Sequence, residues 1–73
     1  MIAKPFHLAL REARRSTIDP DTGKAITQKR LAELIGIGFQ TVSRHERSKH
    51  LPAFHIRKEY FRLLPSLLPY VHN

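Results

Sequence analysis

The stretch LAELIGIGFQTVSRHE, residues 31–46, places two glycines on either side of Ile37, within a run that otherwise favours a helix. Glycine ends helices readily, because it adopts a left-handed backbone conformation without a penalty from a Cβ atom. We therefore predict that one helix ends at Gly36 and that the next begins after Gly38, which serves as its N-cap. Ile37 would point from the turn into the core. Two short helices joined by such a turn form a helix-turn-helix, here over about residues 27–47.

Side chains on both sides of this turn suit such a crossing of helices. Ala32 lies where the two helices would meet, and a bulkier side chain there would separate them. Val42 would face the turn from the second helix. Thr27 is a good N-cap for the first helix, because its hydroxyl can accept a hydrogen bond from a free backbone N–H group. The residues predicted to be buried are Leu10, Leu31, Ala32, Ile35, Ile37 and Val42.

Other segments complete the predicted domain, which spans residues 1–73. KPFHLALREARRS predicts a helix over about residues 5–16, with apolar side chains on one face and arginines on the other. TIDPDTGKA then breaks it, because Asp-Pro and Thr-Gly pairs favour turns. FHIRKEYFRLL predicts a fourth helix, and Pro65 and Pro69 leave room for at most one further turn. The pattern therefore predicts a single all-α domain of four to five helices.

The composition limits the classes of protein to which this chain can belong. Its 73 residues form one domain at most, and 41% of hydrophobic residues suffice for a modest helical core. The absence of cysteine excludes disulfides and thiolate metal sites. Thirteen Lys and Arg against six Asp and Glu give a net charge of +7, which favours a polyanion as partner: nucleic acid first, an anionic membrane surface second. The sequence shows no signal peptide and no apolar run long enough to span a membrane, so a cytoplasmic protein is expected.

The segment ITQKRLAELIGIGFQTVSRHERSKHLP resembles the phage-repressor/Cro-like (Xre-type) helix-turn-helix family, whose members follow the pattern lTQeeLAellGvsrqtvsrwErGkrlP. FHLALREAR is similar to the first helix of that family, so the resemblance covers about residues 6–52. Some positions depart from the family pattern. Phe39 stands where a polar side chain is common, His45 replaces a large apolar residue, and Ser48 replaces a glycine. The loop between the first two helices is also longer than usual.

The resemblance implies a repressor-like domain whose third helix enters the major groove of DNA. The residues that would contact base edges are Phe39, Gln40, Ser43 and Arg44. A Gln side chain can pair with adenine, an Arg side chain can pair with guanine, and an aromatic ring can cover a thymine methyl group. The alternative is an ordinary solvated helix face and, for Phe39, a ring that packs under the fourth helix.

Phosphate contacts would come from helix N-termini and from cationic or small polar side chains near them. The candidates are Gln28, Thr41, Arg47, Lys49 and His50, for each of which the alternative is a solvated surface position. The resemblance also implies that Glu46 pairs with Arg14, which would hold the first and third helices together. The alternative is a Glu46 side chain that is exposed and unpaired.

Metal and catalytic sites are not expected. His45 and His50 are five residues apart and do not share a helical face. DPDTG differs from a calcium loop in the position of its glycine, and Ser43 has no evident base and acid arranged around it. We therefore expect no enzyme activity, no cofactor, no metal and no small-molecule ligand.

The C-terminal segment YFRLLPSLLPYVHN, residues 60–73, is unusually apolar for the end of a chain. One interpretation is that it folds back and completes the core. The other is that it forms a self-association surface, because an exposed apolar patch on a small domain usually marks a partner. A homodimer is expected at least on DNA, because one such domain contacts about half of an operator.

Together these features predict a protein that binds double-stranded DNA by sequence and represses transcription, in the cytoplasm of a prokaryotic or phage-like setting. Two alternatives stay open. A protein-interaction module on the same fold, similar to an antitoxin, would dock through the apolar C-terminal segment and bind DNA weakly or without preference. A non-specific polyanion binder would show affinity with no preference among duplex sequences.

Overall fold

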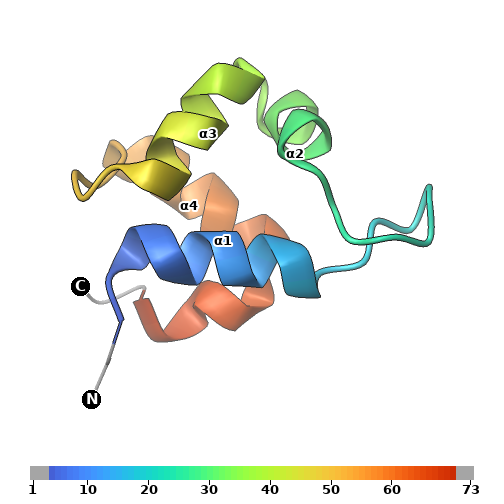
Figure 1. The fold of residues 1–73 in the computed structure, drawn as a ribbon, viewed down its shortest axis with the longest axis horizontal. Helices are drawn as coiled ribbons and strands as arrows, with labels where there is room; N and C mark the ends of the chain where they lie inside the picture. The colour runs from blue at the N-terminus through green and yellow to red at the C-terminus, as the bar shows by residue number, and fades with distance from the viewer. Residues whose placement is uncertain (1–3, 71–73) are drawn as a thin grey trace.

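The computed structural model describes residues 4–70, which form a bundle of short helices (Figure 1). The elements are α1 (Phe6–Ser16), α2 (Gln28–Ile35), α3 (Phe39–Arg47), α4 (Phe54–Leu63) and the 3-10 helix η1 (Pro65–Tyr70). No β-strand occurs among the described residues, where an isolated bridge pairs Ile18 with Ala25 in the loop between α1 and α2. The prediction of a small all-α domain with four to five helices is confirmed.

The helix ends follow from local sequence. Pro5 precedes α1, at a place where a backbone N–H group would have had no partner in the helix. The Thr27 hydroxyl caps α2 by accepting a hydrogen bond of 3.0 Å from the Arg30 backbone N–H. Gly36 ends α2 at φ 87°, in the left-handed region, and Gly38 precedes α3 without a side-chain cap. The predicted break between the two helices is therefore confirmed.

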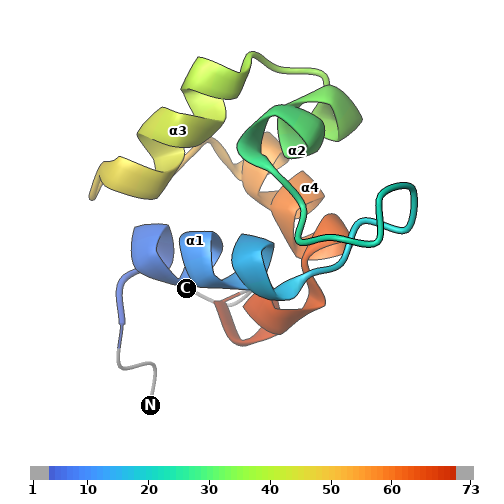
Figure 2. The ribbon, with the colours of Figure 1, turned by 45° about the vertical axis from the view of Figure 1, so that its right-hand side comes forward.

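Every helix contributes to one core. Figures 1 and 2 show α3 lying above α1, α4 passing behind them, and η1 returning beneath α1. α2 packs against α3 and also contacts α4. The side chains at 0% exposure are Leu10, Leu31, Val42, Tyr60, Leu64 and Leu67. Aromatic rings extend this core at the start of α1, where Phe6 and Phe61 meet edge-on with 6.2 Å between their centroids.

Two predictions about the core need correction. Ile35 and Ile37 pack against the core but are only partly buried, because the end of α2 and the turn have solvent on one side. Pro65 and Pro69 do not limit the chain to one further turn, since η1 spans six residues with Pro69 inside it. Burying Leu67 contributes about 1.5–3 kcal/mol. That exceeds the roughly 1 kcal/mol of the hydrogen bond that Pro69 cannot donate.

The C-terminal segment folds back onto α1. Phe61, Leu64 and Leu67 are buried, and the Tyr70 hydroxyl donates a hydrogen bond of 2.8 Å to the Lys4 carbonyl oxygen. For residues 60–70 the structure therefore agrees with the interpretation that this segment completes the core. The remaining residues of the predicted association surface, 71–73, lie outside the described part of the chain.

The loop between α1 and α2 is an ordered hairpin, which we call the 17–26 hairpin after its residues. The Asp19 backbone N–H donates to the Lys24 carbonyl oxygen at 2.8 Å. The Asp19 carboxylate is buried and accepts a hydrogen bond of 3.1 Å from Arg30 Nε. Arg30 also forms an ion pair with Asp21. The hairpin is thus attached to the first turn of α2, and Figure 1 shows it projecting from the right-hand side of the molecule.

Candidate nucleic-acid interface

The buried side chains of α3 show which side of this helix faces solvent. Val42 and Glu46, one turn apart, are buried at 0% and 1% exposure, so the opposite side of the helix faces solvent. Gln40 and Arg44 lie on that side and are exposed, and Ser43, at its margin, is partly buried. Phe39 lies one turn before Val42 on the inner stripe, and it is exposed at the first position of the helix. Figures 1 and 2 show α3 at the edge of the molecule, with no other helix over its outer side.

Phe39 does not pack under α4. Its side chain is 51% exposed, whereas a ring beneath α4 would be buried. Phe39 is the first residue of α3 and directly follows Gly38. An exposed phenyl ring at the start of a helix is poorly hydrated, and covering an apolar group such as a thymine methyl would remove part of its surface from water.

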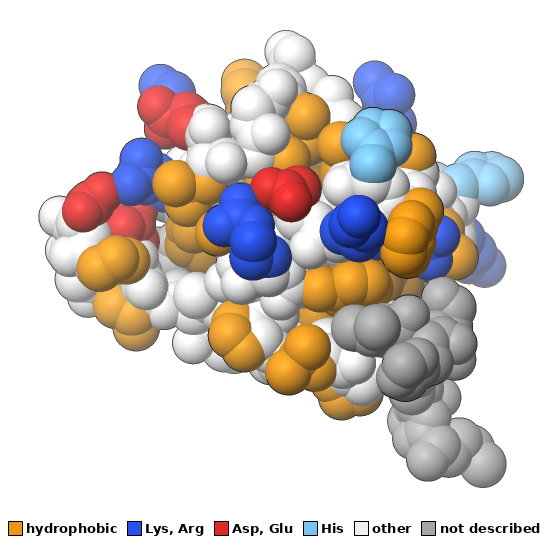
Figure 3. Space-filling view, turned by 180° about the vertical axis from the view of Figure 1, so that it is seen from behind, with side chains coloured by type: hydrophobic (Ala, Val, Ile, Leu, Met, Phe, Trp, Pro, Cys, Tyr) orange, Lys and Arg blue, Asp and Glu red, His pale blue; other side chains and the backbone are white. Residues whose placement is uncertain are grey.

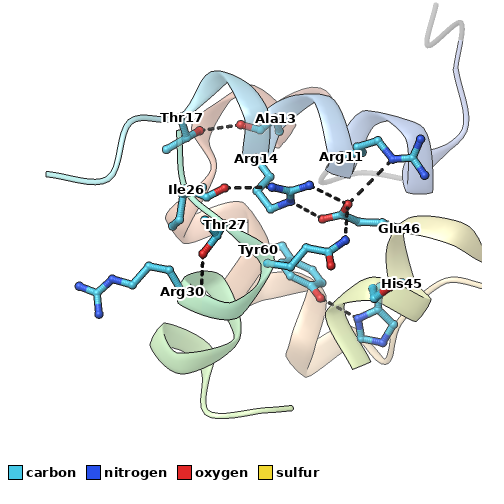
Figure 4. A network of polar contacts seen from close by, with 12 residues as sticks. Arg11, Ala13, Arg14, Thr17, Ile26, Thr27, Arg30, His45, Glu46 and Tyr60 are labelled. Atoms are coloured by element: carbon cyan, nitrogen blue, oxygen red, sulfur yellow. Dashed lines mark hydrogen bonds and ion pairs between the residues drawn. The ribbon is translucent and has the colours of Figure 1, made fainter. Parts of the chain in front are cut away.

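Glu46 holds the inner side of α3 through a network that joins three helices (Figure 4). Its carboxylate accepts two hydrogen bonds from Arg14 of α1, at 2.6 Å from Nε and at 3.2 Å from Nη2. Gln28 Nε2 of α2 donates another at 3.0 Å, and Arg11 Nε lies 4.0 Å away. A buried carboxylate needs such donors, because loss of water disfavours an unpaired charge. The predicted pairing of Glu46 with Arg14 is confirmed, and the exposed alternative is excluded.

Gln28, a candidate phosphate contact at the start of α2, turns its side-chain amide inward to Glu46 and is not a simple solvated surface position. The carboxylate has lone pairs that Arg14 does not fill, and the first position of α2 is within reach of them. A contact from Gln28 to a phosphate would therefore use its backbone N–H at the helix start.

The other predicted phosphate contacts border the outer face of α3. Arg47, Lys49 and His50 are exposed, and Thr41 is partly buried. Arg47 Nε donates to the Ser43 carbonyl oxygen at 3.3 Å, so its side chain lies along α3. The His50 backbone N–H donates a hydrogen bond of 3.1 Å to the Ser48 hydroxyl. This bond closes a short turn in the loop after α3. Positive charge is thus concentrated at the C-terminal end of α3 and in the following loop.

A contact that the sequence does not predict holds α3 from a different side. His45 Nδ1 lies 2.7 Å from the Tyr60 hydroxyl of α4, and the two rings meet edge-on with 5.7 Å between centroids. Burial and the neighbouring Arg44 lower the pKa of His45, and burial together with Glu46 raises the pKa of Tyr60. Both groups are therefore mainly neutral at pH 7, and we assign the Tyr60 hydroxyl as donor and Nδ1 as acceptor. The signal in the sequence is a histidine at position 45, where the family pattern that this segment resembles has a large apolar residue.

Metal-ligand clusters and membrane-spanning helices are absent from residues 4–70. No group of three or more His, Cys, Asp or Glu in this range could hold a metal ion. No helix in the same range combines the length and the apolar character that crossing a membrane requires. Comparison with protein-family models, with curated proteins and with solved structures yields no match for this chain.

Proposed function

We propose that this protein binds double-stranded DNA by sequence and represses transcription. In this proposal α2 and α3 form a helix-turn-helix of the phage-repressor type, and the outer face of α3 enters the major groove. The observation that carries the proposal is this face, which presents Gln40 and Arg44 to solvent one turn apart. The inner side of α3 is held by the hydrogen bonds of Glu46. Such a protein would act in the cytoplasm, without a cofactor or a catalytic activity.

The exposed side chains of α3 suit the edges of base pairs. Gln40 carries a donor and an acceptor, which match adenine, and the Arg44 guanidinium can donate two hydrogen bonds to guanine. Phe39 would cover a thymine methyl group, and the Ser43 hydroxyl can donate or accept. These contacts demand a well-held helix, because a binding constellation tolerates only about 0.5 Å of displacement.

The charge distribution suits the DNA backbone on either side of the groove. Arg47, Lys49 and His50 would meet phosphates at the end of α3, and backbone N–H groups would meet them at the start of α2. Acidic side chains gather at the left of Figure 3, the side on which the 17–26 hairpin lies. We therefore place this hairpin away from the phosphates.

A homodimer on DNA completes the proposal. One domain presents a single α3 and so contacts about half of an operator. Two copies related by a two-fold axis would contact half-sites roughly 34 Å apart, one turn of the duplex. The preferred site is then a palindrome.

The alternative is a protein-interaction module on the same fold, which exposed apolar side chains favour. Leu51 and Phe54, in and just after the loop that follows α3, are 53% and 58% exposed. The Arg57 guanidinium and the Lys58 ammonium lie 5.5 and 5.7 Å from the centre of the Phe54 ring. A partner for this surface would combine apolar and acidic groups.

Selection of duplexes from a random pool by the full chain separates these functions. The proposal expects enrichment of one palindromic sequence. The variant Arg44→Ala should lose the preference at one base pair in each half-site. Arg62→Ala, which removes a charge from exposed α4 surface, should keep it. A wild-type chain that enriches no sequence would overturn the proposal, and equal retention of all duplexes would identify a non-specific polyanion binder.

A further inference from the structure

Two neighbouring residues of α3 make polar contacts with the interior in different directions. Glu46 accepts hydrogen bonds from Arg14 of α1 and Gln28 of α2, and His45 is bonded to the Tyr60 hydroxyl of α4. Successive residues of an α-helix project about 100° apart. The two contacts therefore hold α3 from different sides, as Figure 4 shows.

Contacts from two sides restrict the rotation of a helix about its own axis more than one contact does. The apolar core around Val42 attracts α3 without directional preference, whereas a hydrogen bond weakens when its distance and angle change. We propose that Tyr60 is a positioning residue for DNA recognition: through His45 it sets the rotation of α3 and so directs Gln40 and Arg44. This inference rests on the proposed DNA binding and names what orients the surface that contacts the bases.

The surroundings keep the bond between His45 and Tyr60 in place. Tyr60 lies entirely within the core, where a hydroxyl without a partner costs free energy. The bond needs a neutral His45 to accept it, and burial of the ring, together with the adjacent Arg44 cation, lowers the pKa of His45 and so disfavours its protonation. An apolar residue at position 45 would leave the hydroxyl unpaired. At position 45 this chain therefore has a side chain that forms a directional hydrogen bond, whereas an apolar side chain there would make packing contacts alone.

Tyr60→Phe tests the role of the bond, because it removes the hydroxyl and keeps the ring. Each variant is titrated against the selected duplex and a scrambled one, at a temperature where circular dichroism shows that it is folded. We expect the ratio of the two affinities to fall roughly three- to tenfold, the scale of one hydrogen bond. Tyr70→Phe is the matched control, since it removes the hydroxyl that bonds to Lys4, and its ratio should not change.

Substitutions of the acceptor give a second comparison. His45→Leu removes the acceptor and should lower the affinity ratio as Tyr60→Phe does. His45→Asn supplies a side-chain oxygen that can accept from Tyr60 in place of Nδ1, and it should retain the ratio. Equal loss in the Asn and Leu variants would contradict a role for the hydrogen bond.

Combining His45→Leu with Tyr60→Phe distinguishes positioning from stability alone. Replacing both partners of a buried hydrogen bond with apolar groups is nearly neutral for stability, so the double variant should unfold close to the wild-type temperature. A stable double variant whose affinity ratio stays low supports the proposal. Recovery of the ratio along with the stability overturns it.

A measurement without DNA keeps this inference distinct from the proposed function. The nitrogen NMR signal of His45 should change in Tyr60→Phe and not in Tyr70→Phe. Residual dipolar couplings of the α3 amides, compared with those of α1, should report a rotated α3 in Tyr60→Phe. Unchanged couplings would overturn the positioning role, even if the chain prefers one duplex. Changed couplings in a protein with no duplex preference would support the positioning of α3 and refute the proposed function.

Discussion

Glu46 puts a carboxylate inside the most basic part of a cationic chain. Its charge is tolerated because Arg14 and Gln28 supply hydrogen bonds in place of water. The same donors come from α1 and α2, so a single residue ties α3 to two other helices. This network is stable only when all its hydrogen bonds are present, because removing one partner leaves the charge of Glu46 buried and incompletely paired.

Arg14→Met should destabilise the protein strongly, because it leaves the Glu46 carboxylate buried with Gln28 as its remaining close donor. We expect the free energy of unfolding to fall by about 3–5 kcal/mol, as for other broken buried pairs. Arg15→Met makes the same change at an exposed position of α1 and should cost less than about 0.5 kcal/mol. Urea unfolding followed by circular dichroism compares them, and equal small losses would show that the pair contributes little.

Base contact and phosphate contact should differ in their response to substitution. Arg44→Ala should cost about 1–3 kcal/mol on the selected duplex and relax the preference at one base pair. Lys49→Ala should weaken binding to all duplexes alike and lower the salt slope by roughly one. Titrations of selected and scrambled duplexes at several salt concentrations measure both effects. If Arg44→Ala weakens both duplexes equally, Arg44 contacts a phosphate.

At the scale of elements, the α2–α3 turn depends on its two glycines in different ways. Gly36 has φ 87°, where an L side chain is strained even though a Cβ atom there would have no other atom within 4 Å. Gly38 has φ −74°, which any residue can adopt. A Cβ there would lie 3.9 Å from Thr41 Oγ1, an ordinary contact.

Substitution should therefore have opposite effects at these two glycines. Gly36→Ala should lower the free energy of unfolding by about 1–2 kcal/mol through backbone strain. Gly38→Ser should leave stability unchanged or raise it, because a serine hydroxyl can cap the uncapped start of α3. Thermal unfolding of the two variants tests this. A destabilised Gly38→Ser would show that the turn has no room for a side chain.

The 17–26 hairpin should be dispensable for DNA binding. Replacing residues 19–24 with Asn-Gly keeps the Ile18–Ala25 pair, which a two-residue turn can close. Arg30 would lose its carboxylate partners, a loss that is modest for a partly exposed cation. Duplex titration should give an unchanged affinity and thermal unfolding a slightly lower midpoint. A large loss of affinity would place the hairpin, or Lys24 within it, at the phosphates.

At the scale of the whole molecule, the proposed function would have one small cationic domain present a single α3 to the duplex. A net charge of +7 favours association with any DNA, and in the proposed binding mode one copy would contact only about half of an operator. Two copies on a palindrome double the number of base contacts. The dimer is therefore the form in which we expect discrimination.

Half-site and palindromic duplexes should differ in stoichiometry and affinity. Sedimentation of the full chain with a palindromic duplex should show two copies per duplex, and a half-site duplex should bind one copy more weakly. Half-sites moved by half a helical turn from the spacing of roughly 34 Å should bind as two separate half-sites. One copy per palindrome, with the affinity of a half-site, would contradict the dimer.

The sequence by itself determined the four α-helices and the break between α2 and α3, although not the extent of η1. Thr27, Gly36 and Gly38 act on backbone groups within a few residues of themselves, so their effects can be predicted without knowing the fold. The inner face of α3 also follows from helical spacing, since Val42 and Glu46 lie one turn apart. The partner of Glu46 came from the family resemblance, because spacing alone does not relate residues on separate helices.

Only the tertiary structure decided which distant side chains meet. The contact between His45 and Tyr60 depends on the angle at which α4 crosses α3, and small changes in that angle would separate the two groups. The inward turn of Gln28 and the path of η1 under α1 depend in the same way on how whole helices pack. Hydrogen bonds and close packing act over a few ångströms, so residues far apart in sequence acquire these roles only when the complete core brings them together.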